Sequence, residues 1–112
     1  MTIRRRALPV LLEREFRKMA DTEGATVEIE CVSAPDPEGR FSGEWLFYVV
    51  SATGERFLLV TALARERIIT TGIGLLGLGV SKFNLDHLNI PVVAGDVRGG
   101  MRSRPGGGDP VE

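Results

Sequence analysis

The segment TTGIGLLGLGVSKF, residues 70–83, restricts the possible folds of this 112-residue chain more than any other. Its four glycines alternate with isoleucine, leucine and valine. A glycine inside a helix is less favourable than alanine by about 1 kcal/mol, and the β-branched residues at 68–71 favour a strand. The sequence therefore predicts a strand, a glycine-rich bend and a second strand over residues 68–80, and it disfavours a regular helix there.

Near the N-terminus, residues 7–20 are predicted to form a helix. Their apolar side chains recur at helical spacing on one side, and their charged side chains fall on the other. Pro9 suits the first turn, where the N–H that proline lacks would have no partner within the helix. Gly24 supplies a stop signal.

Three further segments carry strand patterns. Residues 25–33 alternate apolar and polar side chains, which is typical of a strand with one buried face. Residues 44–50 are apolar on both faces, as expected of a central strand. Residues 56–61 are similarly apolar, and the short turn before them, with Gly54, predicts an antiparallel hairpin.

Beyond the glycine-rich segment the predicted structure becomes sparse. Residues 84–88 are expected to form a short helical turn capped by Asn84. Residues 90–94 are expected to be a short extended piece that Pro91 restricts to a sheet edge.

These elements predict one α+β domain over residues 7–94, with the N-terminal helix packed on a small antiparallel sheet of four or five strands. A small SH3-like or OB-like barrel with an added helix is the alternative. Residues 1–6 form a basic N-terminal arm. Residues 95–112 hold six glycines and two prolines and cannot bury enough apolar surface to offset ordering, so a flexible Gly/Arg/Pro-rich tail is predicted.

The net charge of −1 produces no overall field that would attract nucleic acid or anionic lipid. The charges are nevertheless uneven, because residues 1–20 carry six basic and two acidic residues, while residues 21–55 carry one and eight. This complementarity can act within one chain or between copies.

The compartment is predicted from cysteine use and hydropathy. Cys31 is the only cysteine, so no disulfide can form within the chain. No secretory signal pattern is present, and the longest apolar stretch, residues 73–80, is far below the roughly 20 residues that cross a bilayer. These features predict a cytoplasmic protein with no membrane association.

The glycine-rich segment itself has three interpretations. Gly72, Gly74 and Gly77 have the G-x-G-x-x-G spacing of dinucleotide-binding loops, but the surrounding βαβ pattern is missing. A small molecule or nucleotide at this segment is therefore the second alternative, and no cofactor is expected. The segment can instead fill the core, with the glycines permitting a sharp bend.

The third interpretation is self-association, because glycines among large aliphatic residues make a flat and closely approachable apolar surface. The protein is accordingly expected to be a homo-oligomer. The candidate residues for this contact are Ile73, Leu75, Leu76, Leu78 and Val80.

Catalytic and metal chemistry has little support, and no catalytic, cofactor-binding or metal-binding residue is assigned. Cys31 and His87 are the only residues of their kinds, and Cys31 falls on the apolar side of a predicted strand. Zinc lacks paired ligands at the usual spacing. The five acidic residues at 28, 30, 36, 38 and 44 could hold a hard cation, but a solvated strand face explains them better.

Nucleic-acid binding is the first alternative function, since arginines on flexible chain can follow a phosphate backbone. The candidates are Arg4, Arg5, Arg6, Arg98, Arg102 and Arg104. Aromatic residues of the predicted sheet could stack on bases if one face is open, although the core explains them more economically because both faces of residues 45–50 are apolar. They are Trp45, Phe47, Tyr48 and Phe57.

The expected function is therefore that of a small, non-catalytic accessory or regulatory domain. It would act by macromolecular binding to a protein partner that the sequence does not identify, and would associate with itself through the glycine-rich segment. Single-stranded nucleic-acid or RNA binding is the alternative.

Overall fold

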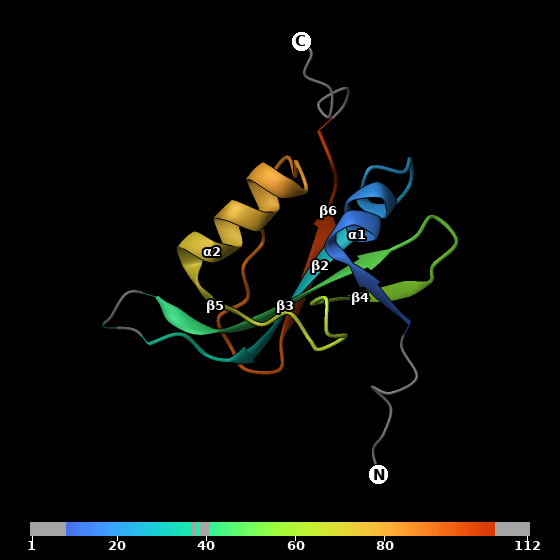
Figure 1. Cartoon of the computed structure of the whole chain (residues 1–112). Coiled ribbons are helices and arrows are strands. Elements are labelled where there is room, and N and C mark those ends of the chain that lie inside the picture. The colour runs from blue at the N-terminus through green and yellow to red at the C-terminus, as the bar shows by residue number, and fades with distance from the viewer. Residues whose placement is uncertain (1–8, 37, 39–40, 105–112) are drawn as a thin grey trace.

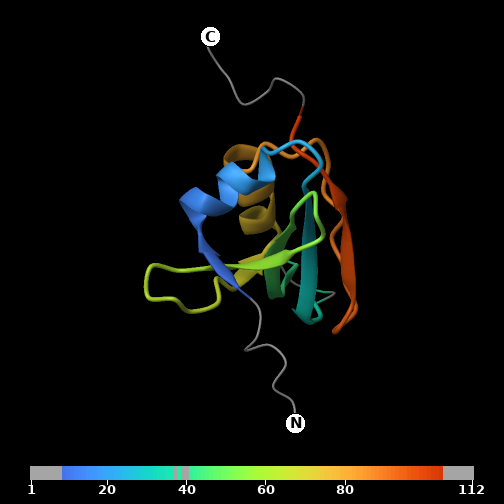
Figure 2. The ribbon, with the colours of Figure 1, turned by 90° about the vertical axis from the view of Figure 1, so that its right-hand side faces the viewer.

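A mixed six-stranded sheet organises the described part of the chain, which is residues 9–36, 38 and 41–104 of a computed structural model. The strands are β1 (Val10–Leu12), β2 (Thr26–Ser33), β3 (Ser42–Val50), β4 (Arg56–Val60), β5 (Ile69–Thr71) and β6 (Val97–Met101). The helices are α1 (Glu13–Ala20), α2 (Gly72–Leu76) and the π-helical segment η2 (Gly77–Lys82) that continues α2. The helices cover one face of the sheet, and their buried residues share one core with it (Figures 1 and 2).

Strand β3 lies at the centre of the sheet, whose order is β1-β4-β3-β2-β6. One edge of β3 pairs with β2, and the other edge is shared by β4 and β5. These pairings are antiparallel, whereas β1 and β4 are parallel. The predicted α+β class is confirmed, but the sheet is mixed and larger than expected. Its described strands follow an open path and not the closed barrel that the sequence left as an alternative.

The hairpin prediction is confirmed. Residues 42–50 and 56–60 pair in antiparallel register around a turn in which Gly54 has a φ of 95°. Trp45 to Val49 are all buried, on both faces of the sheet, as a central strand requires. The alternating segment also forms its predicted strand, β2.

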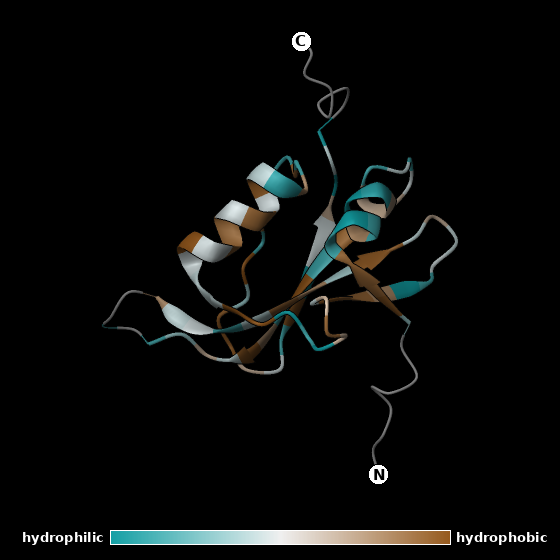
Figure 3. Cartoon of the chain, in the orientation of Figure 1, coloured by the Kyte–Doolittle hydropathy of each residue, from teal (hydrophilic) through white to brown (hydrophobic). Residues whose placement is uncertain are grey.

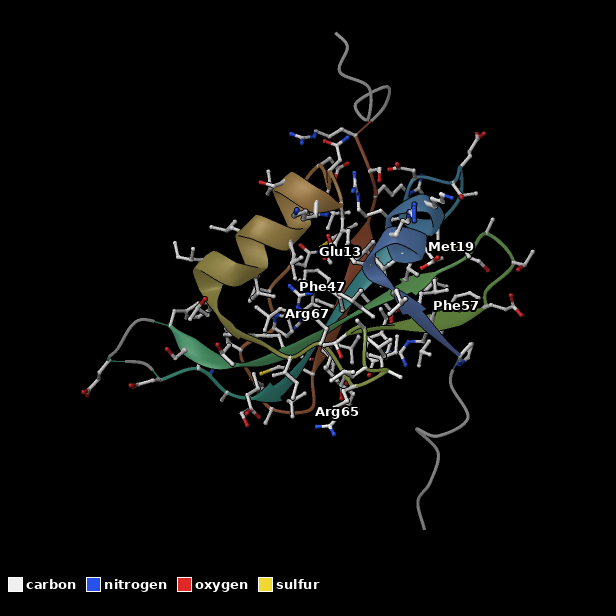
Figure 4. All side chains as sticks on the ribbon, viewed as in Figure 1. Glu13, Met19, Phe47, Phe57, Arg65 and Arg67 are labelled. Atoms are coloured by element: carbon white, nitrogen blue, oxygen red, sulfur yellow. The ribbon has the colours of Figure 1, made fainter. Side chains whose placement is uncertain are left out.

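The predicted helix over residues 7–20 is only partly correct, because α1 begins at Glu13. Residues 10–12 instead form β1, and the N–H of Leu58 donates to the carbonyl of Pro9 at 3.0 Å. The parallel ladder to β4 satisfies backbone groups of this apolar stretch, and this tertiary pairing overrides the helical periodicity. Glu13 then lies 3.6 Å from the guanidinium of Arg67, which ties the start of α1 to the segment before β5 (Figure 4).

Aromatic packing joins the helices to the sheet. The Phe83 ring lies 4.6 Å from Phe16 of α1 and 5.3 Å from Phe47 of β3, measured between centroids. All three side chains are buried. Met19 of α1 and Phe57 of β4 pack at the margin of this core and are half-buried (Figure 4).

The predicted flexible tail begins too early. Residues 97–101 form β6, which pairs with β2 and buries Met101 completely. The Ser103 hydroxyl then donates to the carbonyl of Ala20 at the end of α1. Residues 95–104 thus belong to the folded domain, whereas residues 105–112 and the predicted arm, 1–6, lie outside the described residues.

Gly99 serves close packing in β6 and does not signal flexibility there. A Cβ at Gly99 would lie 2.9 Å from Cγ of Glu28 on the neighbouring strand. The glycine therefore lets β6 lie against a long side chain of β2.

Two smaller predictions are also wrong. Residues 84–88 form no helical turn. Asn84, two residues after the end of η2, has a φ of 54°, so it ends one helix and does not begin another. Residues 90–94 contain no strand, and the Pro91 carbonyl accepts a hydrogen bond from the Trp45 indole at 2.8 Å.

Candidate interaction surface on the glycine-rich helix

The glycine-rich segment is helical, which overturns the predicted strand, bend and strand. Only β5 forms as expected, and helix runs from Gly72 to Lys82 through α2 and η2. We call residues 72–82 the glycine-rich helix. Thr71 precedes it in extended conformation, and its hydroxyl accepts a hydrogen bond from the N–H of Gly74 at 3.0 Å. This N-cap is a sequence signal that favours a helix start.

Three of the four glycines are explained by close packing. A Cβ at Gly72 would lie 2.6 Å from the Phe41 ring, and one at Gly79 would lie 2.5 Å from the Leu88 side chain. At Gly74 the nearest atom, on Ile69, would be at 3.0 Å. Contact with neighbouring side chains therefore offsets the low helix propensity of these positions.

Gly77 is different, because a Cβ there would meet nothing within 4 Å. Its φ and ψ of −59° and −47° are ordinary helical values that any residue adopts. Neither space nor backbone conformation within the described chain requires glycine at this position.

The helix divides the five predicted self-association residues between two sides. Leu75 and Leu78 are buried in the core, which removes them from any surface. Ile73, Leu76 and Val80 are exposed, at 77%, 48% and 38% of their maximal area.

We call the exposed side the outer face; it comprises Ile73, Leu76, Gly77, Val80 and Ser81. Coloured by hydropathy, the helix alternates white and brown up to its last turn, which is teal (Figure 3). The face contains no charged side chain, so it presents a short apolar ridge to solvent.

The backbone of this helix gives no support to nucleotide binding. The N–H groups of the G-x-G-x-x-G spacing would have to point at a phosphate. Instead, the N–H of Gly72 donates to Phe41 and that of Gly74 to Thr71. The N–H of Gly77 bonds within the helix. None of the three remains to bind a phosphate.

Only three of the six nucleic-acid candidates fall within the described residues. Arg4, Arg5 and Arg6 lie outside the described residues. Arg98 pairs with Asp96 at 2.9 Å, and Arg104 donates to Asn84. Arg102 is exposed.

The assignment of the sheet aromatics to the core is confirmed for Trp45 and Phe47, which are fully buried, so they form no open stacking platform. Tyr48 is buried on the other side of the sheet, under the guanidinium of Arg56 at 3.8 Å from the ring centroid. Phe57 is half-buried.

The acidic side chains of β2 have partners that the sequence did not identify. Glu28 forms an ion pair with Arg56 at 2.7 Å, and Glu30 accepts a hydrogen bond from the Tyr48 hydroxyl. Cross-strand register brings these groups together. The alternation of Glu28 and Glu30 with apolar residues in β2 was the sequence signal that the two carboxylates lie on the same face of the sheet. Within the described ranges, no three His, Cys, Asp or Glu side chains are placed to share a metal ion.

Cys31 and His87, the only cysteine and the only histidine of the sequence, occupy unlike environments. Cys31 is fully buried, and burial raises the pKa of its thiol above the ordinary value of 9.0, with the nearby carboxylates of Asp96 and Glu30 adding to the effect. His87 is exposed and contacts Asp86. A nucleophilic thiol needs a lowered pKa, so Cys31 is suited to packing and not to catalysis.

Alkylation of Cys31 should therefore depend on unfolding. We expect iodoacetamide to react at least about 100-fold more slowly with the native protein than with the urea-unfolded chain. The raised pKa also makes stability depend on pH. Below the pKa of Cys31 in the unfolded chain, the thiol is neutral in both states and does not change the free energy of unfolding. As the pH rises above that pKa, the thiol ionises more readily in the unfolded chain, which lowers the free energy of unfolding. Equal alkylation rates in the two states would show that Cys31 is accessible.

Comparison with protein-family models, curated proteins and solved structures finds no match to this chain. None of the helices in the described ranges has the length and apolar character needed to span a bilayer. The functional argument consequently depends on the surface of the fold itself.

Proposed function

We propose that this protein is a small, non-catalytic accessory or regulatory domain that acts by macromolecular binding and associates with itself through the outer face of the glycine-rich helix. A cytoplasmic location is part of the proposal, supported by a single, buried thiol that forms no disulfide within the chain.

Gly77 is the observation that carries the proposal. A glycine in a helix interior lowers stability by about 1 kcal/mol relative to alanine. The other three glycines are offset by contacts within the chain, whereas Gly77 faces open space between exposed apolar side chains. A second backbone approaching the helix closely would give this glycine its function, as small residues do at close contacts between membrane helices.

The exposed side chains beside Gly77 supply a driving force for that contact. Ile73 is more than three-quarters exposed, and Leu76 is nearly half exposed. Fully burying a side chain of this size is favourable by about 1.5–3 kcal/mol. Association would bury such side chains in both copies at once.

The test is the solution mass of the wild-type chain and of Leu76→Asp. By sedimentation equilibrium, the wild type should exceed its 12.2 kDa chain mass at micromolar concentration. Leu76→Asp should weaken association at least roughly 100-fold, because its carboxylate would be buried without a partner.

Leu63→Asp is the matched control, since Leu63 is 78% exposed and lies in the turn after β4, away from the glycine-rich helix. It should leave the mass distribution unchanged. A wild type that remains monomeric at all concentrations would refute the proposal, as would equal effects of the two substitutions.

A further inference from the structure

We propose that the self-association is a two-fold symmetric pairing of two copies, with their glycine-rich helices antiparallel and crossing at Gly77. This inference rests on the proposed function and adds the partner, which is a second copy, and its orientation. Three features of the surface support it: the position of Gly77, the symmetry of the outer face and the charges at its two ends.

Gly77 is the middle residue of the helical segment 72–82. A two-fold contact requires the same patch on both copies, with residue i of one copy facing residue j of the other and the reverse. With the axis at Gly77, Ile73 of each copy faces Ser81 of the other. The bulky end of one ridge then lies against the small end of its twin, and closest approach falls where no side chain intervenes.

The first end of the helix lies beside an acidic loop. The carbonyl of Phe41 accepts a hydrogen bond from Gly72 at 3.2 Å, so the loop between β2 and β3 contacts the helix start. Among the described residues of this loop are the carboxylates of Asp36 and Glu38, and the N–H of Asp36 donates to the carbonyl of Ser42 at 2.9 Å, close to Phe41.

The second end is basic. Lys82 is exposed in the last turn of η2. The guanidinium of Arg104 also lies at this end, where it donates to the carbonyl of Val80 at 3.4 Å. The residues between the two ends, on the outer face, are uncharged.

Antiparallel pairing places the acidic end of one copy against the basic end of the other, twice. Parallel pairing would bring like charges together at both ends. The two ends cannot neutralise each other within one chain, because eleven helical residues separate them by roughly 16 Å. Charge complementarity therefore selects the antiparallel orientation.

Thiol cross-linking tests this orientation directly. Cys31 is the only native cysteine and is buried, so a cysteine introduced on the outer face supplies the reactive thiol. We would make Ile73→Cys and Ser81→Cys, with Leu63→Cys as the control. In each mixture of two variants, one variant carries an affinity tag. The reduced variants are mixed so that subunits exchange, and the mixture is then oxidised.

Antiparallel pairing predicts that the mixture of Ile73→Cys with Ser81→Cys yields at least roughly ten times more disulfide-linked dimer than either variant alone. Leu63→Cys should give only background. Parallel pairing predicts the reverse, with each variant cross-linking to itself.

A charge exchange gives a second readout. Lys82→Glu and Glu38→Lys should each weaken the dimer about 10-fold at low salt, and the double variant should recover most of the loss. A dimer that cross-links in the parallel pattern and shows no recovery would overturn the orientation and leave self-association standing. A wild type that sediments as a monomer would overturn both proposals.

Discussion

Replacing Phe83 with alanine is expected to lower the free energy of unfolding by about 3–5 kcal/mol, the usual range for removing a buried phenylalanine. Phe83 follows η2 directly, and its ring fills the space between α1 and β3. Its side chain is only 1% exposed. Truncation to alanine would therefore leave a cavity inside the core that the surrounding side chains could not readily fill. Urea unfolding followed by circular dichroism would measure the change.

This loss is a large part of the total, since domains of this size are stable by about 5–15 kcal/mol. Phe83→Leu keeps most of the volume and should lose no more than about 1.5 kcal/mol. Leu63→Ala, at a residue that is 78% exposed, should change stability by less than about 0.5 kcal/mol. If Phe83→Ala resembled Leu63→Ala, the ring would not belong to the core.

Local pattern predicted those parts of the fold in which local and tertiary preferences agree. The segments that form β2, β3 and β4 are rich in β-branched and aromatic residues, and the turn at Gly54 joins two of them. Here periodicity, propensity and turn chemistry point to the same hairpin, so the sheet centre could be read from sequence.

The misassigned segments are those in which a distant partner decides the structure. Residues 10–12 have helical periodicity but meet β4 in parallel register. Residues 97–101 have the composition of a flexible tail but pair with the edge of β2 that β3 does not occupy. Neither partner is visible in a local window, because strand pairing of this kind joins residues far apart in the chain.

For the candidate site, the structure tests only which of the predicted residues reach the surface. Three of the five self-association candidates, Ile73, Leu76 and Val80, are exposed. The prediction could not identify Leu75 and Leu78 as buried, because it assumed strands. A strand divides residues between its two faces by alternation, whereas a helix divides them by rotation of about 100° per residue, so the two structures expose different side chains. The helix was missed because glycine propensity was counted without the contacts that Phe41, Ile69 and Leu88 make to three of the glycines.

Adding one methyl group at Gly43 and at Gly77 is expected to change stability in opposite directions. A Cβ at Gly43 would lie 2.7 Å from the carbonyl oxygen of Ser33 and 3.1 Å from backbone atoms of Pro35. Backbone of a paired strand cannot move aside as a side chain can, so Gly43→Ala should lower the free energy of unfolding by about 3 kcal/mol. Gly77→Ala, with open space and helical dihedral angles, should raise it by up to about 1 kcal/mol.

The two variants also separate folding from association. Urea unfolding of dilute, monomeric protein measures the first, and sedimentation equilibrium measures the second. Gly77→Ala should fold more stably yet associate at least roughly 10-fold more weakly, because its methyl group occupies the space through which a second helix backbone approaches. A gain in stability with unchanged association would mean that no close backbone contact forms at Gly77. A loss of stability would mean that this glycine has a role within the chain, and the reason for placing an interface there would be removed.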